Sequence, residues 1–336
     1  MVLSRTGDAA DGRLALEERP APEPGPGEIA IAVEACGVCR TDLHLVEGEV
    51  SAALPIVPGH QVAGRVSRAG PGVAGFREGD AVGVGWLFRT CGACRFCASG
   101  RENLCTAPLH TGRDRDGGYA ESMVADARFA FPLPRGLAPE AAAPLLCAGI
   151  IGYRSLALSG IRPGGRLGLV GFGASAHLAI QVALQRKCAV YVFTREERHR
   201  RLAREMGAAW AGAVGDDPGV PLDAAVTFAP AGDLIPAMLP KLDRGATLAV
   251  NAIHMSPIPS FSFDDLYWER TVRSVASYTR RDAEEFLALA AEVPIRARVE
   301  TFPLEDADAT LLRVKRGEIE GAAVLKIPGS GRSRVP

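Results

Sequence analysis

A glycine turn between an apolar strand and a helix constrains the fold more than any other feature of the sequence. Residues 165–171 predict a short strand, an amphipathic helix follows over 175–187, and a second apolar strand spans 189–193. In that order Gly171 permits a tight turn, and Gly173 lets the backbone approach a pyrophosphate. Helix N-terminal amides would then face the phosphates. The pattern predicts a Rossmann-type dinucleotide site at Gly171, Gly173, Ala174, Ser175 and the small third residue Ala176.

The residues after the second strand bear on the choice of nicotinamide cofactor. An NAD site usually places an acid about 20 residues after the glycine motif, against the ribose 2′-hydroxyl. Here Thr194 and Arg195 follow the strand, and they can bind a 2′-phosphate by hydrogen bonding and charge pairing. Glu196 and Glu197 could oppose a phosphate, but they open a helix, where acids are common. The sequence therefore favours NADP over NAD.

Four closely spaced cysteines predict a structural metal site. They are Cys91, Cys94, Cys97 and Cys105. Four thiolates at this spacing can surround one tetrahedral zinc ion and leave no position open for a substrate. An iron–sulfur cluster fits less well, because its usual run has a shorter final gap and a proline after the last cysteine. A redox-active thiol cluster is the remaining alternative.

A second group of metal-binding residue types lies near the N-terminus. Cys39 and His60 offer the sulfur and nitrogen ligands that zinc binds. A zinc ion shared by these two residues needs a third ligand, and Cys147 is available to supply it. A lone buried cysteine is more often a small apolar residue, so Cys147 alone would not indicate a metal site.

Length and charge limit the remaining possibilities. A chain of 336 residues predicts two domains, and a net charge of −1 offers no electrostatic reason for a nucleic acid or an anionic membrane as partner. Residues 1–13 lack the apolar core of a signal peptide, and we find no apolar run that approaches the roughly 20 residues needed to span a bilayer. These features predict a cytoplasmic protein, with its thiols reduced and a disordered tail at 329–336.

Together these motifs resemble the zinc-dependent alcohol dehydrogenases of the medium-chain dehydrogenase/reductase superfamily, over roughly residues 13–327. The resemblance rests on Cys39-Arg-Thr-Asp-x-His44, on Gly59-His60 with the glycines that follow, on the four-cysteine loop and on Gly171-x-Gly173. Two further stretches look most like bacterial propanol-preferring-type enzymes. They are Val84-Gly-Trp-Leu87 and Gly171-Phe-Gly-Ala-Ser-Ala-His177.

The resemblance implies an α/β protein of two domains. A β-rich GroES-like catalytic domain would comprise residues 1–148 and 288–336, and a doubly wound Rossmann cofactor domain would comprise 149–287. Cys39, His60 and Cys147 would hold a catalytic zinc whose fourth position takes water or substrate. With the structural zinc, this makes two zinc ions per chain. Family members of this length imply a homo-oligomer, either a dimer or a tetramer.

The resemblance also assigns roles around the catalytic zinc. Thr41 and His44 would carry the substrate proton to solvent by way of the cofactor ribose. Asp42 would orient His60, and Gln61 stands where the family usually has glutamate, so exchange at the metal is expected to differ. The side chains expected to line the substrate pocket, which suits small or medium apolar alcohols and aldehydes, are Trp86 and Leu87.

Two other functions compete with a zinc alcohol dehydrogenase. A zinc-free quinone or enone reductase on the same fold would not need the three catalytic ligands together. A non-catalytic NADPH-binding regulatory protein would hold only the structural zinc and would show no turnover.

Overall fold

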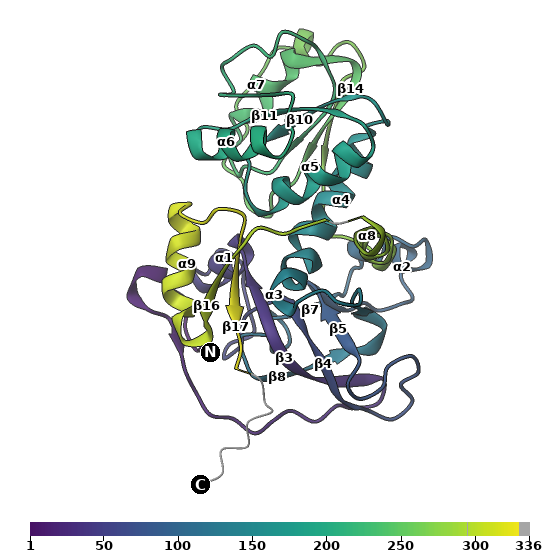
Figure 1. Cartoon of the computed structure of the whole chain (residues 1–336), viewed down its shortest axis with the longest axis vertical. Coiled ribbons are helices and arrows are strands. Elements are labelled where there is room, and N and C mark those ends of the chain that lie inside the picture. The colour runs from purple at the N-terminus through teal and green to yellow at the C-terminus, as the bar shows by residue number, and fades with distance from the viewer. Residues whose placement is uncertain (294, 329–336) are drawn as a thin grey trace. The chain divides into compact units, whose positions relative to one another are not determined.

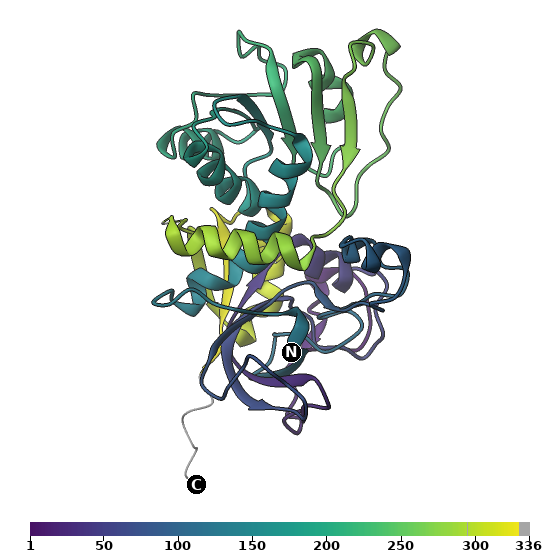
Figure 2. The same cartoon turned by 90° about the vertical axis from the view of Figure 1, so that its right-hand side faces the viewer.

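The computed structural model describes residues 1–293 and 295–328, and the chain divides into two units. The first comprises Met1–Cys147 and the described residues from Thr279 onward, and the second is Ala148–Tyr278. The second boundary differs from the one predicted at 287/288, because helix α8 (Arg280–Glu292) belongs to the first unit. The Arg280 backbone N–H donates to Glu102 Oε1 of that unit at 2.8 Å. In Figure 2, α8 is the long yellow-green helix. The tail predicted at 329–336 lies outside the described residues.

The first unit is organised around a sheet in which most neighbouring strands are antiparallel. Among the described residues its strand order is β16-β17-β3-β4-β5-β9, with β8 also paired to β3. The central strand is mostly buried, and Ile29, Ile31 and Val33 contribute to the core. The bounds are β3 (Glu28–Val38), β4 (Gln61–Ala69), β5 (Ala81–Val84), β8 (Ser122–Asp126), β9 (Ala130–Pro132), β16 (Val299–Pro303) and β17 (Ala322–Lys326). Strand β17 pairs with β3 next to the metal-binding stretch, at Leu325 opposite Cys36.

Short strands and helices complete the first unit. Helices α1 (Arg40–Val46) and α9 (Ala307–Arg316) lie side by side (Figure 1). Two small two-stranded sheets pair β1 with β2 and β6 with β7. The remaining bounds are β1 (Val2–Leu3), β2 (Leu14–Ala15), β6 (Leu87–Arg89), α2 (Arg95–Ala98), β7 (Leu109–His110) and α3 (Pro139–Ala142).

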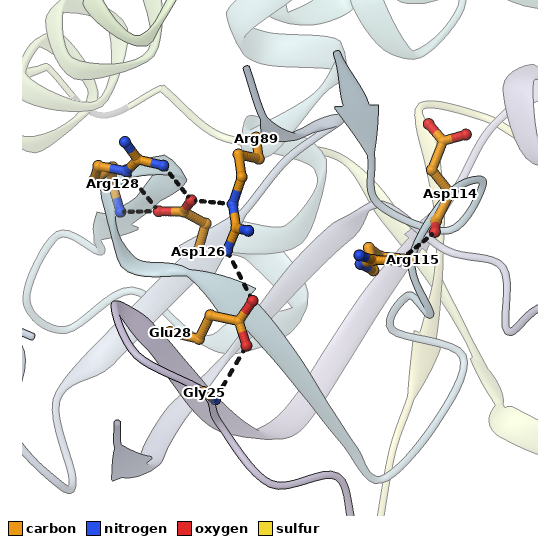
Figure 3. Close-up of polar contacts among 7 residues, drawn as sticks. All are labelled: Gly25, Glu28, Arg89, Asp114, Arg115, Asp126 and Arg128. Carbon is orange, nitrogen blue, oxygen red and sulfur yellow. Dashed lines mark hydrogen bonds and ion pairs between the residues drawn. The ribbon is translucent and has the colours of Figure 1, made fainter. Parts of the chain in front are cut away.

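An ion-pair network joins several of these strands (Figure 3). Arg89 contacts Asp126 at 2.7 Å and Glu28 at 2.8 Å, and Arg128 contacts Asp126 at 2.7 Å. The Asp126 side chain is only 2% exposed. Burial alone would raise the pKa of Asp126, but Arg128 and Arg89 lower it. The carboxylate is therefore held ionised where β3, β6 and β8 meet.

The second unit is a parallel sheet with helices. Among the described residues the strand order is β12-β11-β10-β13-β14-β15, and every neighbouring pair is parallel. The order reverses between β10 and β13, which is where a doubly wound sheet binds its ligand. The strands are β10 (Arg166–Val170), β11 (Ala189–Phe193), β12 (Trp210–Gly212), β13 (Leu222–Thr227), β14 (Leu242–Val250) and β15 (Thr271–Ser274). The helices are α4 (Ala148–Ser159), α5 (Ala174–Gln185), α6 (Glu197–Glu205) and α7 (Leu234–Met238). The predicted α/β fold class is confirmed.

One helical segment corrects the expectation about apolar length. Among the described residues, Pro139–Ser159 is 21 residues long with a mean hydropathy of 1.5, which is enough by length and composition to cross a membrane. Of its most apolar 18-residue window, 61% is buried inside the fold. Core helices of soluble proteins share these properties, so the segment is weak evidence for a membrane.

Candidate active site

The three residues expected to share a catalytic metal come together in the first unit. The ligand atoms of Cys39, His60 and Cys147 all lie within 4.8 Å of one another. Cys39 Sγ lies 3.4 Å from His60 Nε2. A tetrahedral zinc ion holds a sulfur ligand and a nitrogen ligand at a similar separation, about 3.5 Å. The donor set and its spacing therefore fit zinc, with three protein ligands among the described residues.

Local structure explains how this site is positioned. Cys39 is the N-cap of α1, and the Thr41 backbone N–H donates to Cys39 Sγ at 3.3 Å. Asp42 completes a capping box, since its Oδ2 accepts from the Cys39 backbone N–H at 2.9 Å. Its other oxygen, Oδ1, lies 3.0 Å from His60 Nδ1. One buried carboxylate thus fixes both ligands and leaves His60 Nε2 facing the metal position.

Neighbouring side chains favour the thiolate form of Cys39, which is the form that binds a metal. Cys147 and His60 lower the pKa of the Cys39 thiol well below its usual value. A metal binds the thiolate, so a lowered pKa favours binding near neutral pH. Cys36 differs, because burial raises the pKa of its thiol well above the usual value. Cys36 packs in the core and is not one of the converging ligands.

The expected proton-transfer residues lie on α1. Thr41 is partly exposed, and His44 is buried at 8% exposure. The structure pairs His44 Nδ1 with Glu49 Oε2, a contact that we did not predict from the sequence. The signal available in the sequence was Gly48 directly after the helix, which indicates a chain reversal at that point.

The two expected pocket residues have different surroundings. The Trp86 ring lies 5.1 Å from the His60 ring, edge to face, and 4.7 Å from the His110 ring. Trp86 is partly exposed, whereas Leu87 is 2% exposed and packs in the core. Gln61 is also buried, with its side chain folded over Gly37. The structure therefore brings Trp86, but not Leu87, to a partly exposed position beside a metal ligand.

The four remaining clustered cysteines converge as well. Their sulfur atoms lie within 4.8 Å of one another, with separations of 3.5 Å, 3.6 Å and 3.9 Å for three of the pairs. Tetrahedral zinc places two thiolates about 3.8 Å apart, so the cluster fits one zinc ion. The backbone N–H groups of Cys97 and Thr106 lower the pKa of Cys94 to about 6. At least one of the four sulfurs is therefore ready to bind as a thiolate near neutral pH.

The glycine turn in the second unit has the geometry expected of a phosphate site. Gly171 has φ +81°, which favours glycine, and a Cβ there would lie in tight contact, 3.2 Å from the Ala229 Cβ. Gly173 is the N-cap of α5, and a Cβ there would meet nothing within 4 Å. A phosphate can therefore approach the helix N-terminus, where Ala174, Ser175 and Ala176 begin α5.

The end of β11 presents the residues expected near the cofactor ribose. Thr194 is buried, and its backbone N–H donates to Gly212 O at 2.8 Å, whereas Arg195 is exposed. Arg200 donates to the carbonyl oxygens of both Thr194 and Arg195 at 2.9 Å. We did not predict these hydrogen bonds of Arg200 from the sequence, because they depend on how α6 packs beside the end of β11.

Comparisons with known proteins identify the family to which the chain is similar. Residues 25–135 match the family described as alcohol dehydrogenase GroES-like domain. The chain is 48% identical to a probable alcohol dehydrogenase AdhA of Mycobacterium tuberculosis, over 97% of this chain and 96% of that protein. Two solved structures are also similar. A cobalt- and zinc-bound thermostable alcohol dehydrogenase from Pyrobaculum aerophilum has TM-score 0.87 and 27% identity, covering 97% and 98% of the two chains. The CAD from Helicobacter pylori complexed with NADP(H) has TM-score 0.82 and 26% identity, covering 90% and 91%.

Proposed function

Because the chain belongs to the zinc-type alcohol dehydrogenases of the medium-chain dehydrogenase/reductase superfamily, we propose that Cys39, His60 and Cys147 hold the zinc at which its substrate reacts. The protein is an oxidoreductase that interconverts alcohols and aldehydes with a nicotinamide cofactor. The observation that carries the proposal is the convergence of these three ligand atoms within 4.8 Å. A zinc-free quinone or enone reductase is not favoured, because it would not need the three ligands together.

Each residue of the proposed site would have a separate role in the reaction. Zinc, when bound, supplies Lewis-acid polarisation of the substrate oxygen. Cys39, His60 and Cys147 hold the metal, and Asp42 orients His60. The Thr41 hydroxyl would accept the proton that the alcohol loses while giving up its own, and His44 would pass a proton on toward solvent. Trp86 limits the space beside the metal, which favours small or medium apolar substrates such as those of propanol-preferring enzymes.

Metal content and turnover test this proposal together. The purified protein should contain two zinc ions per chain, one of them held by Cys91, Cys94, Cys97 and Cys105, and should oxidise NADPH when an aldehyde is added. Cys39→Ser should lose one zinc ion and the activity. Cys36→Ser is the matched control, because Cys36 is a neighbouring buried thiol outside the ligand set. A wild-type protein with one zinc ion, or an active Cys39→Ser variant, would contradict the proposal.

We further propose that NADP is preferred over NAD. Support comes from Thr194 and the exposed Arg195 at the tip of β11, where Arg200 braces the backbone. Arg195→Ala should raise the KM for NADP more than the KM for NAD. A lower KM for NAD in the wild-type protein would refute the preference.

We also propose that the protein is a homo-oligomer, a dimer or a tetramer, that works in the cytoplasm. Strand β15 lies at the end of the second sheet, and large apolar side chains are exposed in the segment before it. They include Ile253 at 54%, Phe263 at 69%, Tyr267 at 58% and Trp268 at 45% exposure. Exposed apolar patches of this kind commonly mark protein interfaces. Light scattering on the eluting protein should give a multiple of the chain mass, and a monomer would contradict the proposal.

A further inference from the structure

Helix α1 ends in a turn that folds Glu49 back onto His44. Gly48 adopts φ +82°, and its N–H donates to Leu45 O at 3.2 Å, while the Glu49 N–H donates to His44 O at 2.9 Å. These two bonds form a Schellman motif. Such motifs commonly place two apolar residues in contact at the positions that His44 and Glu49 occupy. Here an imidazole and a carboxylate meet at those positions instead.

The side-chain contact defines the state of the imidazole. His44 Nδ1 pairs with Glu49 Oε2, the His44 side chain is 10% exposed, and that of Glu49 is 41% exposed. An ionised carboxylate only accepts hydrogen bonds, so Nδ1 must carry the proton. In the neutral form of the ring, the other nitrogen, Nε2, is then the acceptor. The contact therefore joins a buried imidazole to a solvent-accessible carboxylate.

The turn itself requires glycine. A side chain at Gly48 would adopt a left-handed conformation, and its Cβ would lie 3.0 Å from Thr6 Oγ1.

The neighbouring carboxylates have other partners. Glu47 Oε1 contacts Lys315 Nζ at 2.5 Å, and Asp42 contacts His60 and the Cys39 backbone. Glu49 is thus distinguished from the acids around it by its contact with His44.

We propose that Glu49 is a positioning residue for His44, which it holds with Nε2 ready to accept the substrate's proton. This inference rests on the proposed role of His44 in proton transfer. As the alcohol oxidises, His44 Nε2 gains one proton and the ring becomes a cation. The negative charge of Glu49 offsets that charge at short range. The ring then gives one proton to water or buffer and returns to the neutral form.

The first test reads the histidine ring directly and needs neither metal nor cofactor. Nitrogen NMR of protein with labelled histidines should show His44 protonated at Nδ1, with the signal assigned by its loss in His44→Gln. In Glu49→Ala the ring should shift toward the Nε2-protonated form that free histidine prefers. Glu47→Ala should leave the signal unchanged, because Glu47 pairs with Lys315. A wild-type His44 protonated at Nε2, or no change in Glu49→Ala, would overturn the inference.

The second test measures turnover. Glu49→Ala should lower kcat about tenfold, since general acid–base groups contribute on the order of 10²–10⁴-fold and here only the support of one is lost. The KM for the alcohol should stay constant, and added imidazole buffer should restore the rate by accepting the proton. Glu47→Ala should behave as wild type. A Glu49→Ala protein with unchanged kcat, or one that buffer cannot restore, would count against Glu49.

The role of His44 and the role of Glu49 can be tested separately. If His44→Gln is as active as the wild type, then the proposed role of His44 is wrong, whatever the NMR shows. If His44→Gln is inactive and Glu49→Ala is fully active, then His44 acts without Glu49.

Discussion

Replacing Asp42 by asparagine tests whether one buried carboxylate supports two metal ligands. Asp42 accepts from the Cys39 backbone N–H at 2.9 Å and lies 3.0 Å from His60 Nδ1. Asparagine has nearly the same shape but only one accepting oxygen. In Asp42→Asn, either the Cys39 N–H or the His60 Nδ1–H therefore faces an amide NH₂ group and loses its acceptor.

The expected magnitude follows from burial. Asp42 is 2% exposed and His60 is 1% exposed, so water does not replace the lost acceptor. A buried donor without an acceptor costs about 1–3 kcal/mol. Because about 1.4 kcal/mol is a tenfold change in an equilibrium constant, zinc affinity should fall by about 5- to 150-fold. This range agrees with the usual cost of losing a partner that orients a metal-binding histidine.

The assay is the rate of zinc transfer to a colorimetric chelator, followed together with the amount transferred. Asp42→Asn should release one of two zinc ions faster than wild type, and the ion lost should be the one missing from Cys39→Ser. Asp114→Asn is the matched control, because Asp114 pairs with His110 at 2.9 Å outside the ligand set. If both variants release zinc alike, or if Asp42→Asn matches wild type within about twofold, then the carboxylate does not support the ligands as argued.

Three further outcomes follow from the described geometry. Trp86→Ala should raise turnover of branched or aromatic alcohols relative to ethanol, and an unchanged ratio would contradict a pocket role. In chelator-treated protein at pH 7, iodoacetamide should label Cys94, with a pKa of about 6, before Cys97, whose pKa burial raises to about 11; mass spectrometry would reveal equal labelling as a failure. Asp126→Asn should lower the melting temperature at pH 7. The arginine partners of Asp126 lower its pKa, so they stabilise the fold above the unfolded pKa of about 4. This stabilisation is lost at lower pH, where the difference in melting temperature between the variant and the wild type should shrink.

Features encoded by local sequence could be predicted well. The turn at Gly171 is an example, because its left-handed φ and its approach to Ala229 both select glycine. The Cys91 to Cys105 cluster is another, since its spacing alone confines four sulfurs to a small volume. Cys147 needed the family resemblance, because it lies 108 positions after Cys39 (147 − 39) and nothing local marks it as a ligand.

Features that depend on packing between distant segments could not be predicted. The amphipathic pattern of α8 suits either unit, and its contact with Glu102 decides the assignment. Arg200 braces the end of β11 only because α6 packs there. His110 reaches Trp86 through the pairing of β6 and β7. Glu49 is an intermediate case, since Gly48 indicates the turn but not the side chain that the turn brings onto His44.

The position of Cys147 has a consequence for the unfolded chain. A metal bound by both Cys39 and Cys147 would close a loop of 108 residues, whereas one bound by Cys91 and Cys105 closes a loop of 14 (105 − 91). If each ion stayed bound as the chain unfolds, the chain-entropy estimate for cross-links would apply, with about 4.7 kcal/mol for a loop of about 100 residues and about 3 kcal/mol for one of about 15 residues. The ion at Cys39 and Cys147 would thus link more distant parts of the chain than the four-cysteine ion does, and it would restrict the unfolded chain more for as long as it stayed bound.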